Sequence, residues 1–151
     1  RTPHADQSLK AAIAGLTLGS DAPRIYRALV ESVAFGSRAI VEHFQANNVA
    51  IDEVIAVGGV ANASAYVVQV LADVLQAPIL LPQIEHPAAM GAAMLAATAA
   101  GIHPGVEIAQ QRMASGVERR MVIPDAGRSA TYTQRYQHYL DLAAFEQQSQ
   151  A

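Results

Sequence analysis

Two short apolar runs separated by one helical pattern constrain the fold of this chain more than any other feature. The runs cover Val54 to Val57 and Ile79 to Leu81, and the residues between them, Ser64 to Gln76, place apolar side chains at helical spacing. Runs that are apolar throughout are typical of strands buried on both faces of a parallel sheet. This strand, helix and strand order predicts an α/β layered fold with parallel strands.

The first apolar run leads directly into a pair of glycines, in the segment Val57-Gly58-Gly59-Val60-Ala61-Asn62. Open α/β sheets bind ligands at the carboxyl ends of their strands, and glycine lets a ligand approach the backbone without a Cβ in the way. An ordinary tight turn is the competing interpretation, and for the dipeptide alone it is the commoner one. Neither G-x-G-x-x-G nor G-x-x-x-x-G-K-[ST] occurs, so the sequence supports neither a Rossmann dinucleotide site nor a P-loop.

The longest predicted helix runs from Arg24 to Gln45. Ser20 or Asp21 can cap it, and Pro23 fits its first turn, where a missing N–H costs nothing. One face has apolar or small residues at helical spacing and is expected to be buried: Ile25, Ala28, Leu29, Ser32, Phe35, Gly36, Ala39, Ile40 and Phe44. The outer face is expected to carry four charged residues: Arg27, Glu31, Arg38 and Glu42.

The helix predicted from Pro87 to Ala100 consists of small apolar residues with almost no charge. A helix that is apolar on all sides is expected to be buried. Gly91 in its middle costs about 1 kcal/mol relative to alanine. We therefore expect a neighbouring element or a ligand to come close to Gly91, and the sequence does not choose between the two.

The remaining residues predict a short helix over Val106 to Met113, a strand over Val117 to Ile123, a turn at Pro124 to Gly127 and a final helix from Ser129 to Gln148. One side of the final helix carries a stripe that is more typical of core packing than of a binding platform: Tyr132, Tyr136, Tyr139, Leu140, Ala143 and Ala144. Three strands are fewer than a covered sheet usually has, and the chain does not begin with Met. We therefore expect a fragment of a longer protein.

Composition limits the class of protein. Hydrophobic residues make up 52% of the 151 residues and charged residues 15%, so we expect a folded domain with some apolar surface that meets a partner. A net charge of -3 without a basic stripe argues against a nucleic-acid partner. The chain has no cysteine and no run of 18 apolar residues, so we expect neither disulfides nor a membrane span, and a cytoplasmic location.

Side chains that carry chemistry are not grouped into a recognisable catalytic or metal site. The five histidines have no metal-ligand spacing, and no G-x-S-x-G nucleophile elbow occurs. Six of the acidic residues have plain capping or surface interpretations: Asp6, Asp21, Asp52, Glu53, Asp73 and Glu85. We therefore assign no catalytic residue and no metal ligand in this chain.

Taken together, these segments resemble the carboxyl-terminal part of the FGGY family of carbohydrate kinases, and within it the ribulokinases. The likeness runs through Arg1 to Asp6, Gly15 to Leu18, Ile25 to Gly36, Val57 to Asn62, Gln69 to Leu75 and Ala89 to Ala93. The last two of these segments are similar in order and spacing to the second signature of the family. The tyrosines of the final helix are similar to its Tyr-x3-Tyr-x2-Tyr-Leu ending.

The resemblance implies a ribonuclease-H-like, actin-like ATPase fold, of which residues 1–151 would form a partial carboxyl-terminal nucleotide-binding domain. By position it places ATP contacts on Gly58, Gly59, Val60 and Asn62, with the helix around Gly91 beside the pocket. It also implies Mg²⁺, held largely by the nucleotide and water. The sugar would be held mainly by an amino-terminal domain, and the catalytic aspartate and first phosphate-binding motif would lie upstream of Arg1. Val60 stands where many members of the family have glycine or alanine.

The leading hypothesis is therefore that this chain is the ATP-binding part of a kinase, which transfers the γ-phosphate of ATP to a ketopentose such as ribulose. The chain by itself is expected to be inactive. The alternatives are a non-catalytic actin-like nucleotide-binding module and a domain in which Gly58-Gly59 is only a turn. The sequence leaves open whether the protein forms a homo-oligomer.

Overall fold

The computed structural model describes residues 10–148, so the expected Arg1 to Asp6 segment lies outside the described residues. The helices and strands follow one another in this order: α1 (Ala22–Ala46), β1 (Val54–Ile55), α2 (Gly59–Ala63), α3 (Ala65–Leu75), β2 (Ile79–Pro82), α4 (Pro87–Ala99), α5 (Val106–Met113), β3 (Arg119–Val122) and α6 (Ala126–Gln148). Helices were predicted at the positions of α1, α3, α4, α5 and α6, and the five-residue helix α2 was not predicted.

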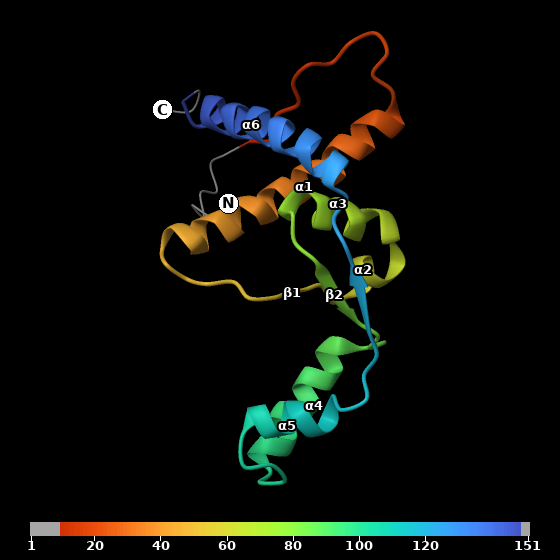
Figure 1. The fold of residues 1–151 in the computed structure, drawn as a ribbon, viewed down its shortest axis with the longest axis vertical. Coiled ribbons are helices and arrows are strands. Elements are labelled where there is room, and N and C mark those ends of the chain that lie inside the picture. Colours follow the sequence, from red (N-terminus) through yellow and green to blue (C-terminus); the bar gives the residue numbers. More distant parts are fainter. Residues whose placement is uncertain (1–9, 149–151) are drawn as a thin grey trace.

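The molecule consists of a body and an arm (Figure 1). The body contains the sheet, with α1, α3 and α6 packed together on one side of it. The arm contains α4 and α5, which pack against each other. It leaves the body after β2 and returns to it at β3, and the backbone N–H of Gln83 donates to the carbonyl of Glu118 at 2.8 Å where the two connections meet.

The sheet has the order β1-β2-β3. β1 and β2 are parallel, as predicted, and Val54 lies opposite Ile79. β3 is antiparallel to β2, so the prediction of a wholly parallel sheet is wrong for this strand. The reason is the arm, because its two helices form a hairpin that returns the chain along β2 in the opposite direction.

The core lies on both sides of α3. Val68 and Ala72 of α3 pack against Ile79 and Leu81 of β2. On its other side, α3 contributes Val70 and Val74 to a cluster with residues of α1 and α6: Ala34, Phe35, Tyr132 and Tyr136. Tyr132 and Tyr136 are thus core residues and Tyr139 is half-buried, as predicted, but the prediction is wrong for the rest of the stripe, since Leu140, Ala143 and Ala144 are exposed. Phe35 lies against the rings of all three tyrosines, with centroids 5.6 to 6.2 Å apart.

Helix α1 begins as predicted, since the side chain of Asp21 accepts a hydrogen bond from the N–H of Arg24 at 3.0 Å. The expected division into a buried apolar face and a charged outer face is wrong at Glu31, which is only 6% exposed. Leu29 and Phe44, which were expected to be buried, are exposed. The cause is α6, which packs across α1 on the side of Glu31 and offers arginine and tyrosine partners to its carboxylate.

Helix α4 is also less buried than predicted. Met94 is its only buried residue, and Leu95 is 59% exposed. A Cβ at Gly91 would meet no atom within 4 Å among the described residues, so no neighbouring element of this part of the chain comes close to it. The reason is that α4 lies in the arm, where α5 covers one of its sides.

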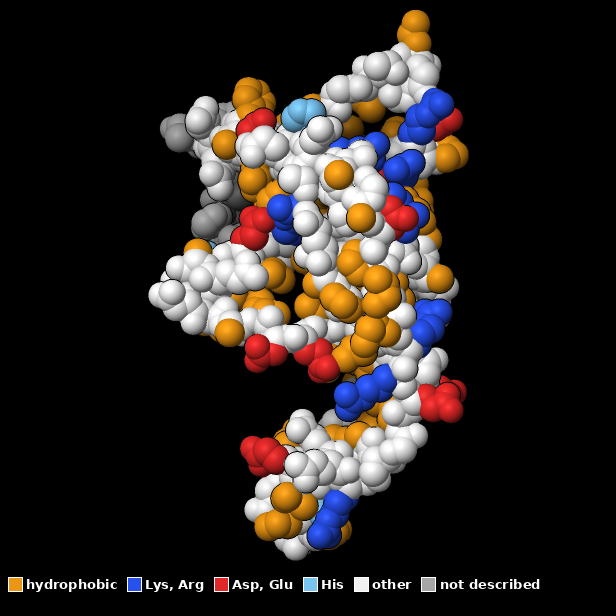
Figure 2. All heavy atoms as spheres, viewed as in Figure 1, with side chains coloured by type: hydrophobic (Ala, Val, Ile, Leu, Met, Phe, Trp, Pro, Cys, Tyr) orange, Lys and Arg blue, Asp and Glu red, His pale blue; other side chains and the backbone are white. Residues whose placement is uncertain are grey.

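The second face of the sheet carries apolar side chains that no helix of the body covers. Ile55 of β1 is 50% exposed and Met121 of β3 is also exposed, so β1 is not buried on both faces as its sequence suggested. Figure 2 shows hydrophobic side chains gathered over this region, down to the narrow connection with the arm. Within residues 10–148, no helix is both long enough and apolar enough to cross a membrane.

Candidate functional site

The paired glycines form the bend between β1 and α2. Gly58 has φ 105° and ψ 178°, a conformation that residues with a Cβ rarely adopt, and it is the N-cap residue of α2. A Cβ placed on Gly58 or Gly59 would meet no atom of the described residues within 4 Å. The loop therefore requires glycine at position 58 for its backbone, whereas the space around position 59 is open.

The four residues predicted to contact ATP lie on this one bend and the helix after it. Val60 is 65% exposed, and Asn62 is exposed as well. The side-chain amide of Asn62 donates through Nδ2 to the carbonyl of Ile84 at 3.4 Å, and its backbone N–H donates to the carbonyl of Gly58 at 3.2 Å. The first N–H groups of a helix have no acceptor within the helix, so the N–H groups of Gly59 and Val60 can serve a ligand.

A groove of about 540 Å³ separates the second face of the sheet from the arm. On the body side, Ile55 and Leu80 line it, and on the arm side Met94 does. The polar side chains at the groove come from α5, the residues after it and β3: Gln110, Gln111, Ser115 and Arg119. Ile55 lies three residues before Gly58, and Ile84, whose carbonyl accepts from Asn62, is another lining residue. The groove and the glycine bend are therefore adjacent in the fold.

The capping or surface interpretation of Asp73 is wrong, because this carboxylate is buried and fixes the carboxyl-terminal half of α3. Asp73 is 1% exposed and accepts hydrogen bonds from Arg128 Nε at 2.5 Å, the Asp125 N–H at 2.7 Å and Gln69 Nε2 at 2.8 Å. Burial by itself would raise the pKa of Asp73, but these three donors outweigh it, and the pKa lies below its ordinary value. Asp73 is therefore an ionised anchor between α3 and the start of α6.

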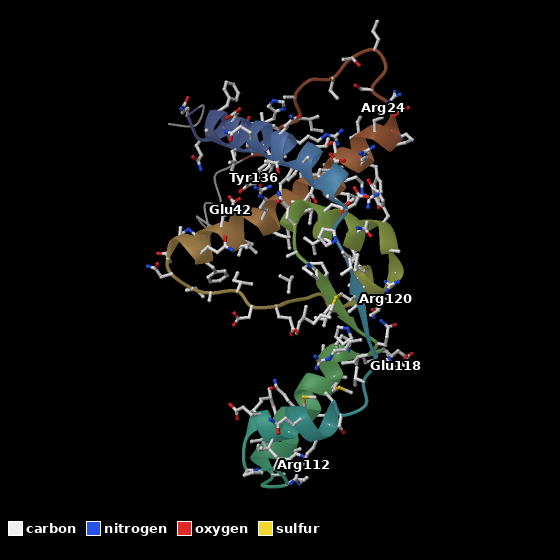
Figure 3. All side chains as sticks on the ribbon, in the orientation of Figure 1. Arg24, Glu42, Arg112, Glu118, Arg120 and Tyr136 are labelled. Atoms are coloured by element: carbon white, nitrogen blue, oxygen red, sulfur yellow. The ribbon has the colours of Figure 1, made fainter. Side chains whose placement is uncertain are left out.

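Two further carboxylates join α1 to α6. Glu31 accepts from Arg27 Nε at 2.7 Å and from Arg135 Nη1 at 2.7 and 2.8 Å. Glu42 accepts from the hydroxyl of Tyr136 at 2.7 Å, and Figure 3 shows these two side chains between the same helices. The hydrogen bond to Glu31 is the main reason that the pKa of Arg27 is raised.

Burial raises the pKa of Tyr132 and, more strongly, that of Tyr136, so both hydroxyls stay protonated near neutral pH. They act as hydrogen-bond donors in the core. The sequence did carry a signal for the pairs Arg27–Glu31 and Arg38–Glu42, because in each the carboxylate lies four residues after an arginine on the same helix. The partners from α6 had no such signal, because they lie about a hundred positions away in the chain.

Metal-binding residue types do not gather in the described part of the chain, residues 10–148. No group of three or more His, Asp or Glu side chains there is close enough to hold an ion.

The sequence model of the FGGY family of carbohydrate kinases, C-terminal domain, matches residues 1–100 of this chain. The chain belongs to this family. The matched residues include the glycine bend and every element from α1 to α4.

Relatives of this FGGY chain include ribulokinases. It is 44% identical to the ribulokinase of Vibrio parahaemolyticus over 97% of its own length, and 38% identical to the ribulokinase of Geobacillus thermodenitrificans over 91%. It spans only 27% and 25% of the lengths of these two proteins. The similarity to the first relative continues well beyond residue 100, because it covers nearly the whole chain.

Solved structures of FGGY sugar kinases have the same fold. A xyloylose kinase from Brucella ovis matches 94% of this chain with a TM-score of 0.79 and 30% identity. A xylulose kinase from Rhodospirillum rubrum matches 87% of the chain with a TM-score of 0.71 and 28% identity. The chain corresponds to 28% and 26% of these two structures. The predicted fold class, α/β of the ribonuclease-H-like, actin-like type, is confirmed.

Proposed function

We propose that this FGGY chain forms the ATP-binding part of a sugar kinase, which transfers the γ-phosphate of ATP to a ketopentose such as ribulose. The observation that carries the proposal is the 44% identity to a ribulokinase across a segment that contains an open glycine bend at the end of a parallel strand. Ligands bind at such strand ends in α/β folds. The sugar-contacting and catalytic groups would lie in the remainder of the protein.

The proposed nucleotide contacts are Gly58, Gly59, Val60 and Asn62. Backbone N–H groups can hold phosphate or ribose oxygens without a charged side chain, and phosphoryl transfer depends chiefly on positioning and charge stabilisation. Mg²⁺ would be bound through phosphate oxygens and water, as is common for this ion. A kinase that consumes cellular ATP and an unphosphorylated sugar is expected in the cytoplasm.

Gly59 offers a direct test, because residues 10–148 leave its Cβ position open. In the full-length protein, Gly59→Val is expected to raise the KM for ATP about tenfold, equivalent to about 1.4 kcal/mol, while the protein stays folded. Gly36→Ala is the matched control, since its new methyl would meet only the hydroxyl of Tyr139 in α6, at 3.7 Å, among the described residues. Its KM for ATP should not change.

Three results would contradict parts of this proposal. An unchanged KM for ATP in a folded Gly59→Val variant would mean that the bend is only a turn. ATP binding without phosphoryl transfer to any sugar would favour the non-catalytic nucleotide-binding module. Transfer to a different class of sugar, with ribulose inert, would overturn the substrate alone.

A further inference from the structure

The arm is attached to the body close to the glycine bend. The Asn62 side chain crosses from α2 to the carbonyl of Ile84, which lies in the short connection between β2 and α4. This hydrogen bond joins residues 22 positions apart in the chain. It links the helix that follows the glycine pair to the point at which the arm begins.

Within residues 10–148, apolar packing gives the arm little other support against the body. Met94 is the only buried residue of α4 and Ala109 the only one of α5, and these two helices pack mainly on each other. The groove of about 540 Å³ lies where contacts with the sheet would otherwise be. Figure 3 shows Arg112 at the far end of the arm and Glu118 where the chain re-enters the body, so a small rotation at the connections would move the arm tip substantially.

We propose that Asn62 is a positioning residue, whose side-chain amide holds the start of the arm in a fixed place beside the glycine bend. This inference rests on the proposed function and changes one of its details. Asn62 acts on the nucleotide through Ile84 and the arm, whereas Gly58, Gly59 and Val60 contact it directly. The amide Nδ2 is already engaged with a protein carbonyl, which fits a structural link better than a ligand contact.

The movement that Asn62 prevents would alter the site itself. Ile84 lines the groove next to Ile55, and Ile55 continues through Val57 into Gly58. A shift of Ile84 therefore changes the groove wall and the support of α2 together. A single exposed hydrogen bond contributes modestly, so the expected loss in ATP affinity is about two- to tenfold.

The test measures the arm directly in the full-length protein. Spin labels are placed on α6 and α5 through Thr131→Cys and Arg112→Cys, in a full-length background from which any cysteine outside this chain has been removed; residues 1–151 contain none. Without nucleotide, Asn62→Leu and the near-isosteric Asn62→Asp are both expected to broaden the label-to-label distance distribution about twofold. Both should also raise the KM for ATP by the two- to tenfold given above.

Gln134→Leu, an exposed amide-to-leucine change on α6, is the matched control and should leave the distribution and the KM unchanged. If the label-to-label distance distribution without nucleotide is unchanged in both Asn62 variants, the proposal is overturned. If ATP affinity nevertheless falls in these variants, Asn62 contacts the nucleotide directly. Absence of ATP binding by the wild-type protein would instead overturn the proposed function. The label distances without nucleotide would still decide whether Asn62 holds the arm.

Discussion

Helices α3 and α4 are both mainly apolar, yet they have opposite surroundings. α3 has five buried residues among its eleven, whereas α4 has one among thirteen. α3 lies between the sheet on one side and α1 and α6 on the other, whereas within residues 10–148 α4 packs mainly against α5. The comparison teaches that apolar composition indicates a need for partners but does not say whether this part of the chain supplies them.

The two helices also differ in their polar anchors. Asp73 of α3 binds two side chains and one backbone N–H from three positions in the chain. The polar side-chain bond described for α4 is internal, from the hydroxyl of Thr98 to the carbonyl of Met94. A buried carboxylate fixes one arrangement of its neighbours when it is well supplied with hydrogen-bond donors, and Asp73 of α3 has three.

The largest effect is expected from removing Asp73, the polar anchor that distinguishes α3 from α4. Asp73→Ala is expected to lower the free energy of unfolding by about 3 kcal/mol, because the Asp125 N–H and the Gln69 amide lose their buried acceptor. Urea unfolding of the protein followed by circular dichroism measures it. Asp141→Ala is the control, since Asp141 accepts one exposed bond from Gln137 and its loss should change stability by less than about 0.5 kcal/mol. Equal effects of the two substitutions would contradict the role of Asp73.

A second pair of variants compares the packing of the two helices. Val74→Ala in α3 is expected to cost about 2 kcal/mol, because Val74 is fully buried and its loss leaves a cavity. Leu95→Ala removes more carbon from α4 but should cost less than about 0.5 kcal/mol in this part of the protein, since Leu95 is exposed. The same unfolding curves provide both values. A larger cost for Leu95→Ala would reveal that another part of the full-length protein covers α4.

The smallest expected effect is the pH dependence of the contribution that Asp73 makes to the free energy of unfolding. The pKa of Asp73 is lower in the folded protein than in the unfolded chain, so its stabilisation is complete above the unfolded pKa, near 3.9. It should disappear as the pH falls through the lower, folded pKa. The difference in unfolding free energy between wild type and Asp73→Asn should therefore be constant above about pH 5 and shrink below about pH 4. A difference that stays constant down to the acid limit would mean that Asp73 is not ionised when buried.

Much of the local structure followed from the sequence. The cap at Asp21, the helix limits near Ser64 and Gln76, and the helix over Val106 to Met113 agree with the structure. These features depend on neighbouring residues, whose chemistry is visible in a short window. The apolar run that ends in Gly58-Gly59 also identified the glycine bend, and the positive φ at Gly58 gives the conformational reason for glycine there.

The missed features all depend on contacts between distant residues. The burial of Glu31 follows from Arg135 and Tyr132 on α6, more than a hundred positions away. The Asn62 link to Ile84 and the antiparallel direction of β3 depend on where the arm leaves and re-enters the body. No periodicity within one segment can encode such relations, because it records only which side of an element is apolar.

The sequence by itself thus determined the class of fold, the order of the elements and the glycine bend at the end of β1, since hydrophobic periodicity and turn chemistry are local properties. Only the tertiary structure decided which apolar faces find partners, which carboxylates are buried, and how the arm is attached beside the bend. The physical reason is that burial and hydrogen-bond pairing belong to pairs of surfaces, and those surfaces meet only when the chain is folded.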